Sequence, residues 1–179
     1  MSKAVGSKLA PLLPDIIPLL SSIMMQLDEE KSVDLDNELS EACLTTVHAI
    51  IRRCPREVSS YIPELFRNAI ELVEYDPNYT YNDDEDMQED EAMEDWGSDF
   101  DDDEQEAMHD DDDTSWKVRR SAIKIIDATI KTRPEFVKTI VSNYSVRLVN
   151  RFKERIDDVK CDLIDTFRDL LATSVESGP

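Results

Sequence analysis

The feature that most constrains this sequence is an acidic run at residues 83–113. It holds 19 of the chain's 41 Asp and Glu residues and contains no Lys or Arg. The other 148 residues carry 22 acidic and 20 basic side chains, so nearly all of the formal net charge of −21 lies in this run. Such a segment buries too little apolar surface to offset its ordering entropy, and its like charges repel. We therefore expect a disordered, solvated insertion.

Outside the acidic run, apolar residues recur at helical spacing, and the whole chain contains only three Gly, which disfavours a turn-rich sheet protein. Helices are expected at about residues 9–27, 35–53, 58–74, 116–131, 134–153 and 156–173. Pro55 and Pro77 are expected to end the second and third of these, and Pro18 to kink the first or mark its true start. The predicted fold class is all-α.

The same spacing predicts which side chains point inward. The inward set includes Leu12 and Leu19 of the first helix, Leu39 of the second, and Ile164 and Leu171 of the sixth. Two further expectations concern the tryptophans. Trp116 should be partly buried at the start of the fourth helix, whereas Trp96 lies in the acidic run and should be exposed to water.

The even-numbered helices begin alike, which indicates a repeat. Val118 and Val159 are 41 residues apart, and Leu39 and Val118 are 48 apart once the 31-residue run is set aside. Both steps are close to the roughly 40–47-residue period of HEAT and armadillo arrays. The sequence therefore favours a short α-solenoid of about three helix pairs, with a compact six-helix bundle as the alternative.

The sequence therefore predicts five parts of the chain. Residues 1–8 form a disordered start, 9–82 carry HEAT helices one to three, 83–113 are the acidic insertion, 114–173 carry HEAT helices four to six, and 174–179 are a tail.

Composition also bounds the cellular setting. Cys43, Cys54 and Cys161 form an odd set with no CxxC pair, which we interpret as reduced core residues of an intracellular protein. No stretch reaches the roughly 18 apolar residues of a membrane span, and no secretory signal opens the chain. We expect a cytoplasmic and nuclear location and no membrane partner. The strong negative charge also disfavours nucleic acid, whose binding depends on Lys and Arg.

No catalytic, cofactor or metal site is predicted. The carboxylates of the acidic run share one solvated environment, whereas acid–base catalysis needs two different ones. Asp99, Asp101 and Asp103 have the spacing of calcium ligands in an EF-hand, but Glu104 replaces the required Gly and Asp110 the final Glu. His48 has no second His or Cys at metal-ligand spacing.

Basic residues concentrate after the acidic run, where the chain has 13 Lys and Arg but only 9 Asp and Glu. They are either ordinary solvated helix faces or a ridge that binds an acidic surface of a partner or the chain's own acidic run. The candidate partner-binding residues are Lys117, Arg119, Arg120, Arg151, Lys153 and Arg155.

Four stretches together carry a resemblance to a known family. They are RRCPREV from Arg52, YDPNYTYNDDED from Tyr75, DDDDTSWKVRRSA from Asp110 and RFKERIDDVK from Arg151. In this order they resemble the N-terminal half of the cullin-associated, neddylation-dissociated proteins, over roughly residues 9–173.

The resemblance implies a non-catalytic HEAT-repeat scaffold without a cofactor. Members of this family embrace the cullin–RING core of ubiquitin ligases when the cullin lacks its ubiquitin-like modifier, and they exchange substrate receptors. The expected partners are therefore a non-neddylated cullin and its RING subunit, bound by a monomeric piece of about three repeats. The alternative is a nuclear-transport-receptor-like or histone-chaperone-like HEAT module that binds basic cargo.

Overall fold

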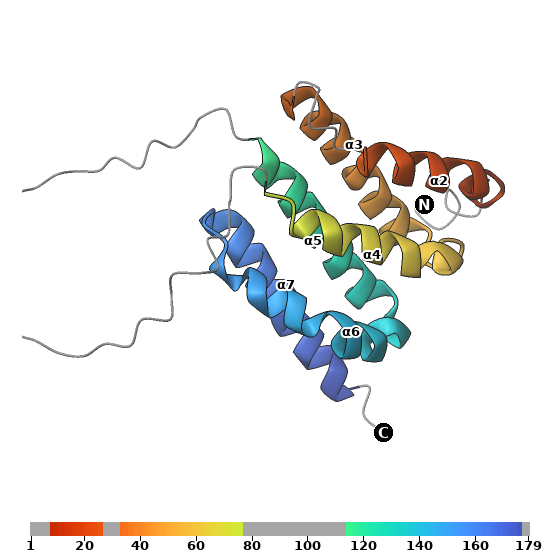
Figure 1. The fold of residues 1–179 in the computed structure, drawn as a ribbon. Helices are drawn as coiled ribbons and strands as arrows, with labels where there is room; N and C mark the ends of the chain where they lie inside the picture. The colour runs from red at the N-terminus through yellow and green to blue at the C-terminus, as the bar shows by residue number, and fades with distance from the viewer. Residues whose placement is uncertain (1–7, 27–32, 77–113, 177–179) are drawn as a thin grey trace, which may run out of the picture.

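The computed structural model describes residues 8–26, 33–76 and 114–176, and every regular element in these ranges is helical (Figure 1). The α-helices are α2 (Leu13–Met24), α3 (Val33–Arg53), α4 (Ile62–Val73), α5 (Ser115–Thr132), α6 (Val137–Asn150) and α7 (Asp157–Glu176). Short 3₁₀ turns lie at Ala10–Leu12, Ser59–Tyr61, Pro134–Phe136 and Arg151–Lys153. The acidic run at residues 83–113, with its expected disorder, lies outside the described residues.

Prolines mark several helix starts. Pro14 and Pro63 occupy the first turns of α2 and α4, where a missing backbone N–H costs no helical hydrogen bond. Pro18 behaves differently, because α2 begins before it and continues through it to Met24. The sequence-based option that Pro18 marks the true start of this helix is therefore wrong.

The six helices form three pairs, α2 with α3, α4 with α5, and α6 with α7. Figure 1 shows α3, α5 and α7 side by side in one layer, with α2, α4 and α6 in the other. Helix α5 packs against α3, α4 and α7 and so joins all three pairs. The prediction of an all-α solenoid of three helix pairs is confirmed for the described residues, and the compact bundle is not observed.

One apolar core runs through all three pairs. Fully buried members include Ile17 of α2, Leu44 of α3, Leu65 of α4, Ile126 of α5 and Leu163 of α7. Because the core is continuous from pair to pair, each repeat is stabilised by its neighbours rather than by a core of its own.

The inward stripe predicted for the first helix is displaced. Leu13 and Ile17 are buried, whereas Leu12 is 51% and Leu19 60% exposed. This helix is apolar around most of its circumference, so periodicity alone cannot identify the buried side.

Three other inward predictions are wrong. Leu39, Ile164 and Leu171 are exposed, the last two on α7, which among the described helices packs against α5 and α6. Cys161 is exposed as well, although Cys43 and Cys54 are buried core residues, as expected. Burial raises the pKa of both buried thiols, which keeps them protonated.

The prediction for Trp116 is confirmed, because this side chain is half-buried and packs against the core. Trp96 lies outside the described residues.

Candidate functional site

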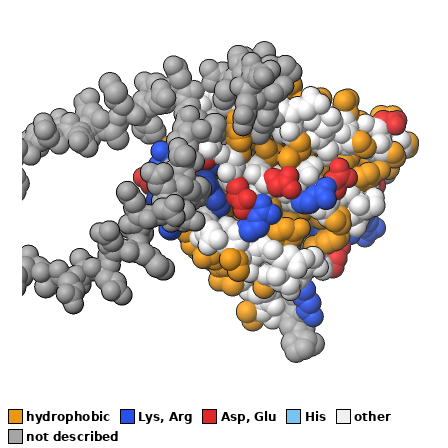
Figure 2. Space-filling model, viewed as in Figure 1, with side chains coloured by type: hydrophobic (Ala, Val, Ile, Leu, Met, Phe, Trp, Pro, Cys, Tyr) orange, Lys and Arg blue, Asp and Glu red, His pale blue; other side chains and the backbone are white. Residues whose placement is uncertain are grey.

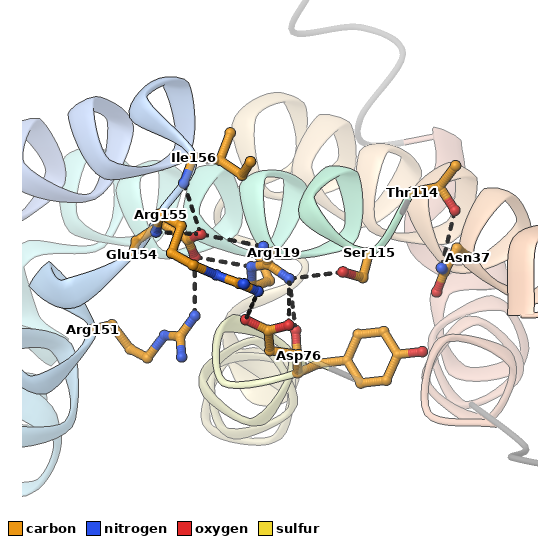
Figure 3. Close-up of polar contacts among 10 residues, drawn as sticks. Asn37, Asp76, Thr114, Ser115, Arg119, Arg151, Glu154, Arg155 and Ile156 are labelled. Atoms are coloured by element: carbon orange, nitrogen blue, oxygen red, sulfur yellow. Dashed lines mark hydrogen bonds and ion pairs between the residues drawn. The ribbon is translucent and has the colours of Figure 1, made fainter. Parts of the chain in front are cut away.

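A buried ionic cluster lies where the second and third helix pairs meet (Figure 3). Its centre is Arg119, on the second turn of α5 and only 1% exposed. Arg119 Nε donates to Glu154 Oε2 at 2.9 Å and Nη2 donates to Oε1 at 3.2 Å, which makes a bidentate pair. Arg119 Nη1 donates to Ser115 Oγ at 2.8 Å and to the Tyr75 carbonyl at 3.2 Å. The guanidinium therefore has partners on three sides.

Glu154 lies in the turn between α6 and α7 and collects several donors. Arg151 Nη2 donates to its Oε2 at 2.9 Å, and the backbone N–H groups of Arg155 and Ile156 donate to its Oε1 at 3.0 and 3.2 Å. These two amides immediately precede α7, where a negative charge is favoured by the helix dipole. One carboxylate thus pairs with two arginines and accepts hydrogen bonds from the backbone N–H groups at the start of α7.

Asp76 brings the end of α4 into the same cluster. Its Oδ1 lies 3.8 Å from Arg119 Nη1 and its Oδ2 lies 3.5 Å from Arg155 Nη2. We call the seven residues that meet here the Arg119 cluster: Tyr75, Asp76, Ser115, Arg119, Arg151, Glu154 and Arg155. The cluster joins α4, α5 and the α6–α7 turn, and so ties two repeats together.

The electrostatics of Glu154 follow from this geometry. Burial by itself would raise the pKa of the carboxyl group. This effect is outweighed by the charge and hydrogen bonds of Arg119, by the hydrogen bond from the Ile156 amide and by the charge of Arg151. The net result is a lowered pKa, so Glu154 stays ionised in the folded protein.

The described residues on either side of residues 77–113 are both anchored to the scaffold. Asp76 belongs to the Arg119 cluster on one side. On the other, Thr114 precedes α5 and accepts a hydrogen bond at 3.0 Å from Asn37 Nδ2 of α3. Both attachment points therefore lie on the same end of the helix stack (Figure 1).

The six predicted partner-binding residues do not form one exposed ridge. Arg119 and Arg151 are buried in the Arg119 cluster, so the expectation of solvated or partner-facing side chains is wrong for these two. The physical reason is that Glu154, 35 residues from Arg119, pairs with both of them inside the protein.

The other four predicted residues reach solvent in different settings. Arg120 pairs with Asp158 at 2.9 Å and Asp162 at 2.7 Å, and Arg155 is half-exposed beside Asp76. Lys117 Nζ lies 5.9 Å from the centre of the Trp116 ring, and Lys153 is exposed. Partner binding by these four residues stays a prediction.

A different basic site lies in the layer of α3, α5 and α7. A groove of about 370 Å³ runs between α3 and α5, and we call it the α3–α5 groove. Its lining residues are Thr45, His48, Arg52, Ser121, Lys124 and Asp127. The sequence contained a weak signal for it, since His48 and Arg52 are four residues apart on one helix face, but their convergence with Lys124 depends on packing between two repeats.

A second hollow, of about 220 Å³, lies beside it between α5 and α7 and shares Lys124 and Asp127. Several of its charged side chains are paired with one another. Lys131 Nζ lies 2.6 Å from Asp127 and 3.0 Å from Asp169, and Arg168 pairs with Asp165 at 2.8 Å.

The opposite layer presents paired charges. In Figure 2, acidic and basic side chains alternate across the middle of the visible face, along α4. There Arg147 of α6 makes a bidentate pair with Glu74 at 2.7 and 2.5 Å. Charges that are already neutralised in this way attract a partner only weakly.

Among the described residues, no three or more His, Cys, Asp or Glu side chains are grouped so as to hold a metal ion. No helix in the described ranges is long and apolar enough to cross a membrane.

Comparison with known proteins identifies the family. No family model matches the chain. Cullin-associated NEDD8-dissociated protein 1 of Drosophila melanogaster is 40% identical over 139 residues, which cover 76% of this chain and 11% of the relative. The Arabidopsis thaliana protein of the same name is 36% identical over 171 residues, 96% of this chain and 13% of its own length. Cullin-associated NEDD8-dissociated protein 2 of Mus musculus is 34% identical over the same extent. The chain thus spans about an eighth of the length of these relatives, and it belongs to the cullin-associated NEDD8-dissociated family.

Proposed function

We propose that this chain is a non-catalytic HEAT-repeat scaffold that binds the cullin–RING core of ubiquitin ligases. Through this binding it would take part in regulating ligase assembly and substrate-receptor exchange. The observation that carries the proposal is the 36% identity, over 96% of the chain, to a relative whose name states cullin association.

The layer of α3, α5 and α7 is the proposed binding face. It carries both hollows and the cationic residues Arg52 and Lys124, for which the described part of the chain shows no ion pair. On the opposite layer, Arg147 and Glu74 already neutralise each other. A partner with complementary charge therefore gains more binding free energy on the layer of α3, α5 and α7 than on the layer of α2, α4 and α6.

Binding of a purified cullin–RING complex to the immobilised chain tests this proposal. We expect saturable binding of the unmodified complex, and affinity at least about tenfold weaker, or about 1.4 kcal/mol, for the complex that carries the ubiquitin-like modifier. Biolayer interferometry at several complex concentrations gives both dissociation constants.

Two outcomes would contradict parts of the proposal. No binding of either complex would refute cullin recognition by this chain. Equal binding of both would refute preference for the non-neddylated form. Core histones serve as the basic-protein control, and binding of histones alone would instead favour a histone-chaperone-like module.

A further inference from the structure

The α3–α5 groove is a local concentration of positive charge in a strongly acidic chain. Arg52 and Lys124 line it, both are exposed, and neither is ion-paired within the described part of the chain. Neighbouring cations of the same layer are paired, Arg120 with Asp158 and Asp162, and Lys131 with Asp127. The groove therefore brings together two cations, one from α3 and one from α5, that are not ion-paired within the described residues.

The acidic group in the groove does not cancel this charge. Asp127 is the one carboxylate that lines it, and Lys131 Nζ lies 2.6 Å from Asp127 Oδ1. Lys131 thus offsets part of the charge of Asp127 from outside the groove, and this one carboxylate faces two cations inside it. Thr45 and Ser121 add only neutral hydroxyl groups to the lining.

The cations of the groove affect the pKa of His48. Burial is the first cause that lowers its pKa, and the charges of Arg52 and Lys124 lower it further, against a smaller opposite effect of Asp127. These three side chains are the charged groups that face the His48 ring, one from α3 and two from α5. An anion placed among them would reverse their effect and make protonation of His48 easier.

We propose that the α3–α5 groove binds the carboxylate of an Asp or Glu side chain presented by an acidic segment of a partner protein, held by Arg52 and Lys124 from two different repeats. This proposal deepens the proposed function, because it assigns a chemistry to the contact between this chain and its partner. It needs a partner protein with an acidic segment, and it does not need that partner to be a cullin.

The charge of the groove favours a carboxylate over a phosphate group. With His48 neutral, two cations face one anion, Asp127, and a singly charged carboxylate matches that balance. A dianionic phosphate would face stronger repulsion from Asp127, and protonation of His48 would be needed to offset it. Two cations on separate helices also suit the two oxygens of one carboxylate.

The direct test is an NMR titration of the intact chain with the blocked peptide acetyl-Glu-Gly-Glu-amide. Because the peptide adds negative charge beside His48, we expect the His48 ring resonances to shift and the pKa of this residue to rise on binding. By linkage, peptide affinity should increase as the pH is lowered through the titration of His48. The matched acetyl-Gln-Gly-Gln-amide should produce neither effect.

Paired charge reversals provide the variant control. R52E/K124E should weaken peptide binding by about tenfold or more, because two attractions become repulsions. R53E/K138E makes the same change in net charge at two exposed residues outside the groove, and it should leave binding within about twofold. Circular dichroism of both variants checks that the fold is kept.

Specific outcomes separate this proposal from the proposed function. Equal losses in the two double variants, or binding of inorganic phosphate but not of the Glu peptide, would overturn the groove assignment. If the Glu peptide binds as expected while the cullin–RING complex does not bind, the groove assignment stands and the cullin proposal fails. If the cullin–RING complex binds equally to the wild type and to R52E/K124E and the peptide does not bind, the groove assignment fails and the cullin proposal stands.

Discussion

Replacement of Arg119 by Ala is expected to lower the free energy of unfolding by about 3–5 kcal/mol. The substitution removes the bidentate partner of Glu154, whose side chain is 2% exposed, and leaves that carboxylate with Arg151 as its nearest charged partner. It also leaves Ser115 Oγ and the Tyr75 carbonyl without the Arg119 donor. Urea unfolding followed by circular dichroism measures the change.

Arg120→Ala is the matched control. Arg120 is the next residue on the same helix and also pairs with two carboxylates, but its side chain is 30% exposed. Water screens these pairs, so the expected loss is about 1 kcal/mol or less. A loss for Arg119→Ala no larger than that for Arg120→Ala would show that the Arg119 cluster does not hold the repeats together.

Acid is expected to destabilise the fold through Glu154. The pKa of this carboxyl group is lowered in the folded state, so its contribution to stability is complete above the ordinary glutamate pKa of about 4.3 and is lost as the pH falls through the folded-state value. Protonation removes the negative charge that Glu154 places beside the buried Arg119 and Arg151. Glu154→Gln should therefore cost about 3 kcal/mol at pH 7, the size expected for breaking a buried pair.

The pH dependence distinguishes destabilisation caused by protonation of Glu154 from a general destabilisation of the fold by acid. The difference in unfolding free energy between wild type and Glu154→Gln should be constant near neutral pH and should shrink as the pH falls below about 4.3, since the wild type then loses the same charge. Glu74→Gln is the control, because Glu74 also pairs bidentately with an arginine but is 39% exposed. A pH-independent difference for Glu154→Gln would contradict the assignment.

The fold was largely predictable from the sequence. Apolar periodicity located helices α3 to α7, although it placed Leu39, Ile164 and Leu171 inward and they are exposed. Proline positions help to mark where helices begin or end. The inward face of α2 was not predictable, because its sequence is apolar on nearly every side and Leu12 and Leu13 are equally plausible core residues. Packing against α3 decides between them.

The Arg119 cluster was less predictable. The sequence KVRR from Lys117 reads as a basic helix start, and nothing local distinguishes Arg119, which is buried, from Arg120, which is not. The distinction depends on Glu154, which comes from the next helix pair. The α3–α5 groove has the same character, because Arg52 and Lys124 meet only when two repeats stack.

Hydrogen exchange followed by mass spectrometry, on the chain alone and with an excess of the unmodified cullin–RING complex, tests the central claim that a partner binds the layer of α3, α5 and α7. The account predicts slower exchange in α3 and α5 around the groove when the complex is present, with α4 unchanged. Slower exchange confined to α2, α4 and α6, or no change at any complex concentration, would contradict it.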